Sequence, residues 1–187
     1  SGGDIAQSVS VFAALEGEGM DSWSCFLLQR GMDGFTVGRK ESKMGQRASA
    51  ATELIMDNVF VPDSHLVGEL YQGWGINRAV LNYSRIPVGA IALGIARGAM
   101  ESAVEFASSQ SQGGKPLINY QEVQLAIAQM LMEVSAMRCM VWNFANTWTL
   151  RQSRASMAKT FCSDTAVKVC ERAMELMGNH GILHHKR

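Results

Sequence analysis

The chain has 187 residues, of which 47% are hydrophobic and 18% charged, and its 17 Lys and Arg residues are balanced by 17 Asp and Glu residues. This composition is ordinary for a globular chain with a hydrophobic core, and the length allows one large domain or two small ones. Because the formal net charge is zero, the sequence lacks the basic character that attracts nucleic acid or an anionic membrane surface, and we expect neither as a partner.

Three further features exclude other classes of protein. The longest apolar stretch, residues 86–96, has about half the length of a bilayer-spanning helix and predicts a buried helix. The four cysteines lie far apart without the CxxC spacing of metal sites, which indicates reduced thiols in a core. The chain opens at Ser1-Gly2-Gly3 without a recognisable targeting segment, as if cut from a longer protein, and we expect that protein in the cytoplasm of a bacterium or in the mitochondrial matrix.

Residues 1–74 show the pattern of a small β-domain. Short apolar or alternating runs, separated by glycine-rich and Asp-Asn turns, occur at residues 5–15, 23–29, 35–37, 52–56 and 59–61. Pro62 ends the last run because proline has no N–H to donate to a ladder, and we expect a turn at Gly45 among basic side chains. Strands of this length and spacing predict a small antiparallel sandwich or barrel.

Residues 75–187 have a helical period of about 3.6, with long segments at residues 76–109, 120–150 and 153–177. Pro87 lies inside the first segment, and we expect a bend near Tyr83 because proline removes a backbone hydrogen bond there. Gly178 follows the third segment as a capping glycine. Three long helices with short connections predict most of an up-and-down bundle, so the chain as a whole is predicted to be α+β.

The apolar faces of the helices predict how the bundle packs. The residues expected to face the core are Ala79, Val80, Ile86, Ala90, Leu93, Ala96 and Met100 in the first helix and Val123, Ile127, Met130, Leu131, Val134 and Met137 in the second. Ala90, Gly94 and Gly98 form a small-residue stripe that allows another helix to approach closely. The second helix has apolar residues on its other sides as well, including Trp142 and Trp148, which predicts association into dimers or tetramers.

One stretch is harder to explain by packing alone. Residues 38–62 read GRKESKMGQRASAATELIMDNVFVP, and taken by itself this segment is a sheet edge with solvated charges. Further motifs follow it, namely Asn82-Tyr83-Ser84-Arg85, Gly114-Lys115-Pro116-Leu117 with Tyr120-Gln121, Ala158-Lys159 and Gly178-Asn179-His180-Gly181. In this order the segments resemble the middle β-domain and the C-terminal helical domain of the acyl-CoA dehydrogenase family.

The resemblance implies a function for the full-length protein. Members of this family are flavoproteins of fatty acid metabolism, oxidoreductases that desaturate acyl-CoA thioesters at the α,β carbons. It implies FAD as cofactor, a short-to-medium acyl-CoA as substrate, and electron-transfer flavoprotein or a similar electron acceptor as partner. It also implies a homotetramer, or a heterotetramer. The chain is then a fragment, with the middle β-domain in residues 1–74 and the helical bundle domain in residues 75–187, both incomplete.

Two residues of the first helix are implied to bind substrate. The family's equivalents of Asn82 and Arg85 face the thioester and the pantetheine arm of acyl-CoA, whereas the residues alone equally allow an arginine with a packed stem and a solvated head. Ser84 stands where some members carry a glutamate base, and a serine cannot deprotonate a carbon acid. The catalytic base is therefore expected beyond Arg187, and the 187-residue chain alone is expected to be inactive.

The same resemblance implies contacts to the pyrophosphate and adenine end of FAD on a neighbouring subunit. The implied residues are Gln110, Gln112, Leu117, Tyr120 and Gln121 in the break between two helices, and Glu175, Gly178 and Asn179 near the end of the chain. Gln110 replaces an arginine of the family and Gly113 a phenylalanine, while Glu175 and Asn179 replace Gln and Gly. Charge-assisted phosphate contacts are about twice as strong as neutral ones. The loss of the arginine thus leaves an alternative open, a non-catalytic, flavin-poor subunit or assembly module of a heteromeric complex.

Three histidines near the end of the chain could suggest a metal site. His180, His184 and His185 include a pair four residues apart, but no Cys or carboxylate accompanies them at ligand spacing. Histidines that follow a helix end also interact favourably with the helix dipole. We therefore expect no metal at this cluster.

Overall fold

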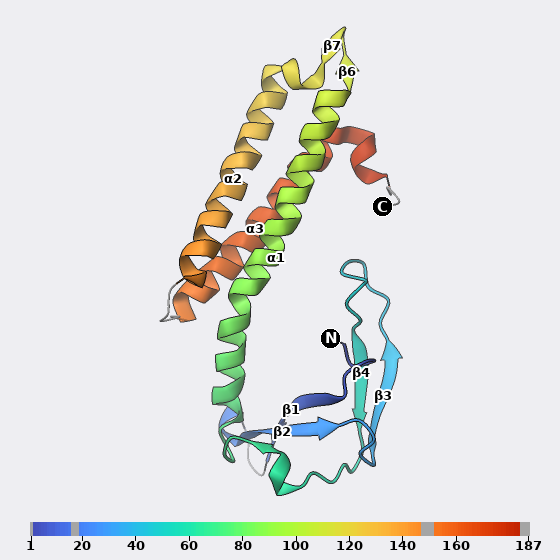
Figure 1. Ribbon diagram of the computed structural model, residues 1–187, viewed down its shortest axis with the longest axis vertical. Coiled ribbons are helices and arrows are strands. Elements are labelled where there is room, and N and C mark those ends of the chain that lie inside the picture. Colours follow the sequence, from blue (N-terminus) through green and yellow to red (C-terminus); the bar gives the residue numbers. More distant parts are fainter. Residues whose placement is uncertain (1, 16–18, 147–151, 184–187) are drawn as a thin grey trace. The chain divides into compact units, whose positions relative to one another are not determined.

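The structure, a computed structural model, describes residues 2–15, 19–146 and 152–183. The chain divides into two compact units, residues 1–79 and residues 80–187 (Figure 1). The first unit contains the longer strands and the second contains most of the helical residues. The α+β class predicted from the sequence is confirmed.

The first unit is built from two small antiparallel sheets. One sheet has the order β1 (Ser8–Ala14), β2 (Trp23–Gln29) and β5 (Leu66–Val67), and the other pairs β3 (Phe35–Lys40) with β4 (Thr52–Met56). The pairing of β1 with β2 runs without a register shift from Ser8 opposite Gln29 to Ala14 opposite Trp23. The predicted strands at 23–29 and 52–56 have the predicted limits.

The helix α1 (Gly73–Ser109) begins in this unit, directly against β2. A Cβ added to the buried Gly73 would lie 2.7 Å from the backbone carbon of Ser24, so only glycine allows this approach. The Ser24 hydroxyl accepts a hydrogen bond of 2.8 Å from the backbone N–H of Tyr71, and Trp74 contacts Trp23 edge-on, with ring centroids 5.8 Å apart. These contacts fix where the helix starts.

Two details of the first unit differ from the prediction. Residues 59–61 do not form a strand, because the backbone turns at Asn58, where φ is 50°, and the following residues join no ladder among the described strands. In the loop between β3 and β4, the residue with a positive φ is Gln46 (48°) rather than Gly45. The pairing of β5 with β2 was not predicted, since two residues are too few to show an alternating pattern.

The second unit contains three long helices that run up, down and up in Figure 1, as predicted: most of α1, α2 (Gln121–Ala145) and α3 (Gln152–Met177). Pro87 lies inside α1 without ending it. The 3₁₀ helix η4 (Gly178–Ile182) follows α3, and Gly178 has the positive φ (55°) of the predicted capping glycine. The predicted end of the second helix at residue 150 lies outside the described residues.

The core between the helices is rich in small side chains. Its buried members are Ile86, Ala92, Ala96 and Ala103 in α1, Met130, Val134, Met137 and Val141 in α2, and Ala155, Ala158, Cys162, Ala166, Val169 and Ala173 in α3. Alanine lets helix backbones come close, and the longer methionine side chains of α2 fill the space that remains.

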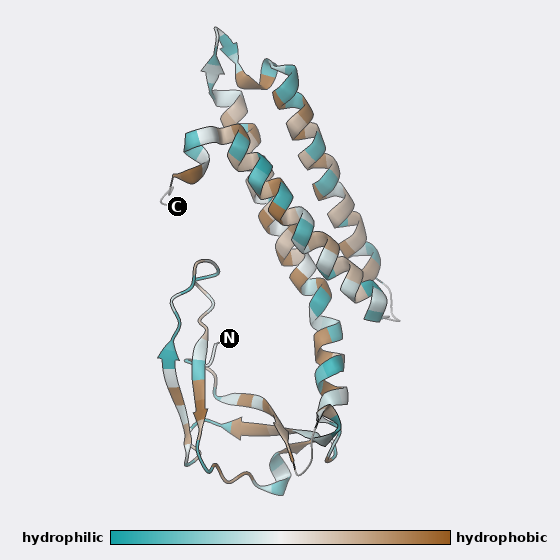
Figure 2. Ribbon diagram, turned by 180° about the vertical axis from the view of Figure 1, so that it is seen from behind, coloured by the Kyte–Doolittle hydropathy of each residue, from teal (hydrophilic) through white to brown (hydrophobic). Residues whose placement is uncertain are grey.

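Several residues predicted to face the core are instead exposed. They are Ala79, Val80, Ala90 and Leu131. Within the apolar stretch 86–96, Ile86, Ala92 and Ala96 are buried, but Ile91 and Ile95 are each 53% exposed, so the prediction of a buried helix holds for one face only. Apolar residues therefore extend around the helices, as Figure 2 shows for α1 and α2. By length and composition both helices could cross a membrane, a property that core helices of soluble proteins share.

Candidate functional site

The first candidate position is the middle of α1, where Asn82 and Arg85 are both half-buried. Residues three apart share a helix face, so both side chains project from the same side of α1. Ser84 donates its hydroxyl hydrogen to the backbone oxygen of Leu81, at 3.1 Å. The side chain of Arg85 makes no ion pair or hydrogen bond with any described residue.

Other arginines of the chain are engaged within the protein. Arg30 donates to the backbone oxygens of Gly3, Asp4 and Ala6 at 2.9–3.0 Å, Arg97 pairs with Glu101 at 2.6 Å, and Arg172 pairs with Glu133 at 2.9 Å. A half-buried guanidinium carries a desolvation cost unless its donors are satisfied. Arg85 is therefore the arginine best suited to bind an acceptor from outside the described chain.

The second candidate position is a tight hairpin between α1 and α2. Its two-residue strands, β6 (Ser111–Gln112) and β7 (Lys115–Pro116), are joined by Gly113 and Gly114, whose φ angles are 60° and 83°. Two consecutive positive φ values are typical of a type I′ hairpin turn, which explains the Gly-Gly pair. The backbone N–H of Leu117 donates to the Gln110 oxygen at 2.8 Å and closes the base of the hairpin.

Tyr120 holds the two strands of this hairpin in place. Its hydroxyl donates a hydrogen bond of 2.5 Å to the backbone oxygen of Gln112, and the ammonium of Lys115 lies 4.0 Å from the centre of its ring. A Cβ at Gly113 would lie 2.8 Å from the same hydroxyl. The phenylalanine that the family resemblance implies at position 113 is thus incompatible with Tyr120 in this arrangement.

The remaining hairpin residues differ in exposure. Gln110 and Gln112 are exposed, as is Gln121 at the start of α2, while Leu117 and Tyr120 are half-buried. The hairpin therefore presents two side-chain amides and one ammonium to solvent, and every one of these groups can donate a hydrogen bond. Such a set of donors fits an anionic group such as a diphosphate.

The third candidate position is the end of α3 with η4. Glu175, Gly178 and Asn179 are all exposed, and Gly181 packs so closely on Met174 that an added Cβ would lie 2.9 Å from its backbone. The ring of His180 contacts that of Phe106 on α1, with centroids 5.0 Å apart. Phe106 precedes Gln110 by one helical turn, so η4 lies against the end of α1 that leads into the hairpin.

His180 is the member of the histidine cluster that the structure describes, whereas His184 and His185 lie outside the described residues. The described part of the chain contains no group of three or more His, Cys, Asp or Glu side chains that could hold a metal ion. The described ring contact of His180 is with Phe106.

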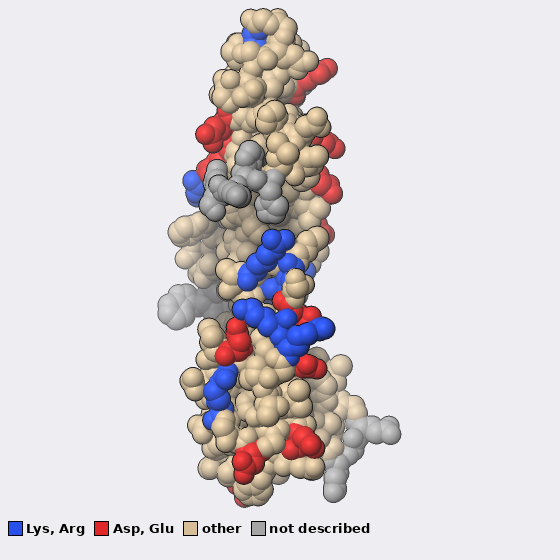
Figure 3. Space-filling model, turned by 90° about the vertical axis from the view of Figure 1, so that its right-hand side faces the viewer, with Lys and Arg blue, Asp and Glu red and all other residues tan. Residues whose placement is uncertain are grey.

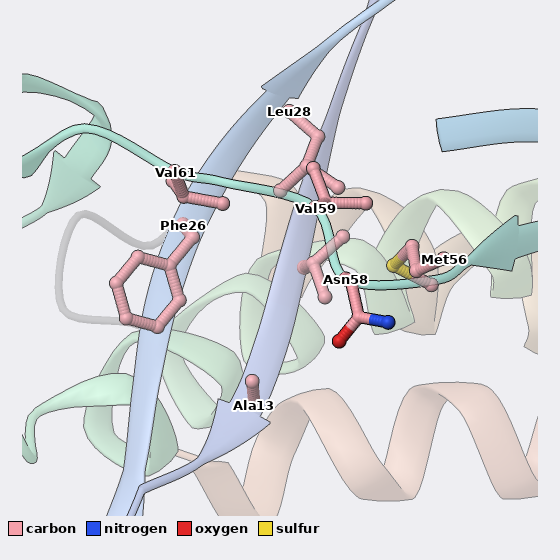
Figure 4. Close-up of a pocket in the computed structure, with 8 residues that line it drawn as sticks. Ala13, Phe26, Leu28, Met56, Asn58, Val59 and Val61 are labelled. Carbon is pink, nitrogen blue, oxygen red and sulfur yellow. The ribbon is translucent and has the colours of Figure 1, made fainter. Parts of the chain in front are cut away.

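The first unit has an apolar concavity of about 250 Å³ (Figure 4). It is lined by Val11, Ala13, Phe26, Leu28, Met56, Asn58, Val59 and Val61. Among the described residues, the lining contains no ionisable side chain and Asn58 is its only polar member. The concavity thus offers apolar surface but no group for acid–base or electrostatic catalysis.

The basic side chains of the β3–β4 loop gather on the face shown in Figure 3. Lys43 donates from Nζ to the backbone oxygens of Gln46 and Ser49, at 2.8 and 2.5 Å, and Arg47 donates to the oxygen of Lys43 at 3.2 Å. Lys40 is paired with Asp4, and Arg39 with Glu41. These contacts give the basic loop a structural role, in agreement with its interpretation as a charged sheet edge.

Comparison with known proteins identifies the family. The sequence pattern of the family described as acyl-CoA dehydrogenase, C-terminal domain, matches residues 71–187. An acyl-CoA dehydrogenase of Bacillus subtilis is 39% identical over 169 residues, which cover 89% of this chain and 45% of that protein. The chain therefore belongs to the acyl-CoA dehydrogenase family.

Solved structures agree with this assignment. Butyryl-CoA dehydrogenase from Megasphaera elsdenii has a TM-score of 0.91 and 34% identity, over 97% of this chain and 49% of that one. A chain in the structure of the electron transferring flavoprotein of Acidaminococcus fermentans has a TM-score of 0.92 and 34% identity, with the same two coverages. The chain spans about half the length of the curated relatives it matches.

Sequence reasoning found the hairpin as a break between helices but missed its organisation. The Gly-Gly pair is a recognisable signal for a two-residue turn, and the tyrosine and the lysine that flank it were both visible. What the sequence could not show is that the Tyr120 ring folds back over the hairpin, because this depends on the direction in which α2 leaves it.

Proposed function

We propose that the full-length protein is an FAD-dependent acyl-CoA dehydrogenase, which desaturates an acyl-CoA thioester between its α and β carbons. The observation that carries this proposal, beyond family membership, is the half-buried Arg85 without a partner in the described chain, one turn after Asn82 on α1. An acyl-CoA offers the carbonyl oxygens of its thioester and pantetheine arm as acceptors for these two side chains.

The proposed roles follow from the donors on α1. Arg85 binds and orients the acyl-CoA by donating hydrogen bonds to its oxygens, and Asn82 adds an amide donor and acceptor on the same face. Ser84 has a hydroxyl group where a base would need a carboxylate, and this hydroxyl donates a hydrogen bond to the backbone oxygen of Leu81. The proposal therefore takes the base from a part of the full-length protein outside residues 1–187, and the 187-residue chain by itself is inactive.

The cofactor contacts in this proposal come from the hairpin and from η4. Bound FAD would supply the acceptor for the hydride that leaves the β carbon. Gln110, Gln112 and Gln121 would donate hydrogen bonds to its adenosine diphosphate end, and Leu117 and Tyr120 would pack beside it. Residues Glu175, Gly178 and Asn179 would form a second contact on the adenine side, and both contacts would reach the FAD of a neighbouring subunit.

The proposal includes partners and location. The exposed apolar residues of α1 and α2 favour a tetramer in which copies of the helical unit contact one another. The similarity to a chain in an electron transferring flavoprotein structure supports electron-transfer flavoprotein as the electron acceptor. We place the protein in the bacterial cytoplasm or the mitochondrial matrix.

Arg85→Gln in the full-length protein tests the substrate site. Charged hydrogen bonds contribute about 1.5–3 kcal/mol, so the Kd of a non-oxidisable acyl-CoA analogue should rise by about tenfold to a hundredfold. Arg97→Gln, on the same helix but in an exposed pair with Glu101, is the matched control and should leave the Kd unchanged. Equal affinity of wild type and Arg85→Gln for the analogue contradicts the proposed site.

One observation favours a second function. Gln110 is exposed and uncharged where the family resemblance implies an arginine, as expected of a flavin-poor subunit that assembles with an active partner. The flavin content of the purified full-length protein, read from its visible absorbance, separates the two functions. Stoichiometric FAD supports the dehydrogenase, and a flavin-free but correctly assembled protein supports the assembly module.

A further inference from the structure

Lys115 is the sole cation in a long part of the chain. Between Arg97 and Arg138 the sequence contains no other Lys or Arg, although it contains the carboxylates of Glu101, Glu105, Glu122 and Glu133. The lysine is exposed and forms no ion pair with a described residue. Any anion that binds at this end of the helical unit therefore meets one basic side chain of the hairpin.

The structure also restrains this cation. Its ammonium lies 4.0 Å from the centre of the Tyr120 ring, an arrangement that is attractive because the face of an aromatic ring is negative. The ring is held in turn by the hydrogen bond from its hydroxyl to Gln112, the residue that pairs with Lys115 across the hairpin. Gly113 leaves the space that this hydroxyl occupies. Lys115, Tyr120, Gln112 and Gly113 thus form one unit that fixes a positive charge beside the exposed amide of Gln112.

We propose that Lys115, positioned by Tyr120, is the cation that binds a nucleoside diphosphate at this hairpin. Two exposed glutamines beside it add neutral donors, so the site combines one charge with amides, which suits the oxygens of a diphosphate. FAD and CoA both carry an adenosine diphosphate group. The inference rests on the proposed function, in which the ligand at the hairpin is FAD, and it assigns to Lys115 the charge that Gln110 does not supply.

The test is a titration of the flavin-free full-length protein with FAD, followed by fluorescence, and with CoA, followed by calorimetry. Lys115→Gln should raise the Kd for FAD about tenfold and reduce its dependence on salt concentration, because one charge contact is lost. Lys115→Arg should stay within about threefold of wild type. Lys168→Gln, an exposed lysine on α3, is the control and should change neither Kd.

A double variant separates charge from hairpin structure. If Lys115 acts through its charge, Gln110→Arg added to Lys115→Gln should recover most of the lost affinity, whereas a purely structural lysine would not be rescued. If Lys115→Gln weakens the binding of FAD alone, the site belongs to the cofactor. If it weakens the binding of CoA alone, the site belongs to the substrate. Unchanged affinity for both ligands in Lys115→Gln overturns the inference while leaving the proposed function intact. A wild type that binds no FAD contradicts the proposed function itself, and CoA binding then decides the inference.

Discussion

Gly89 on α1 lies directly against the backbone of Ala158 on α3. A Cβ added to Gly89 would be 3.3 Å from the Ala158 carbonyl oxygen and 3.7 Å from the Cβ of Cys162. The close approach of two helices that the sequence suggested for Gly94 and Gly98 therefore occurs at a different glycine. At those two positions an added Cβ meets no described atom within 4 Å.

Gly89→Ala should lower the free energy of unfolding by about 1 kcal/mol, because the added methyl group would lie 3.3 Å from the Ala158 carbonyl oxygen and the α3 backbone would have to shift to accept it. Gly98→Ala is the matched control, because it adds a methyl group to the same helix without a neighbouring atom. It should raise the free energy of unfolding by about 0.5–1 kcal/mol through helix propensity. Urea denaturation of both variants under dilute, monomeric conditions measures the two effects. If Gly89→Ala also raises the free energy of unfolding, the contact at Gly89 is not tight.

The ion pair between Glu133 and Arg172 joins α2 to α3, with side chains 18% and 31% exposed. Arg172→Met leaves the shielded carboxylate of Glu133 with the Gln129 amide as its remaining hydrogen-bond donor in the described chain, so we expect a loss of about 1–3 kcal/mol in the free energy of unfolding. The pair between Arg97 and Glu101 is more than half exposed on both sides, and Arg97→Met should cost at most about 0.5 kcal/mol. Thermal unfolding measures the stability of both variants. If Arg172→Met and Arg97→Met lose similar amounts of stability, the difference in shielding between the two ion pairs has no energetic effect.

Burial raises the pKa of the Cys162 thiol above its ordinary value. Because the folded chain then keeps this proton to a higher pH than the unfolded chain does, the free energy of unfolding should fall as the pH rises through the ordinary thiol pKa of about 8.5. Cys162→Ala should make this fall smaller, and Cys139→Ala, which removes an exposed thiol, should not. Urea denaturation between pH 7 and about pH 10 provides the measurement; identical pH profiles for wild type and Cys162→Ala would refute the assignment.

Exposed apolar side chains on the helices should mediate self-association. Ile91 and Ile95 lie on α1, and on α2 Trp142 is 62% exposed. Ile91→Glu combined with Ile95→Glu should shift the full-length protein from the proposed tetramer toward smaller species, since each buried apolar side chain contributes about 1.5–3 kcal/mol. Sedimentation velocity at micromolar concentration measures this. Glu105→Gln, a change at an exposed polar position of α1, serves as the control. A double variant that remains tetrameric places the interface elsewhere.

The sequence by itself determined the α+β class, the presence of three long helices, and the limits of the strands at residues 23–29 and 52–56. These features depend on local periodicity and on capping residues such as Gly178. The family resemblance of the sequence also agreed with the later comparison. None of this required knowledge of which surfaces meet.

Only the tertiary structure decided which helix faces are covered. A hydrophobic pattern shows that Ala90 and Ile91 are apolar, but burial depends on whether a neighbouring helix reaches them, and in the described chain none covers either residue. The same reason explains the hairpin: Lys115 and Tyr120 are separate letters in the sequence, and they become one charged unit because the chain reverses at Gly113 and brings the Tyr120 ring under the ammonium. Contacts between residues that are distant or on opposite sides of a turn follow from the path of the backbone, which no local pattern encodes.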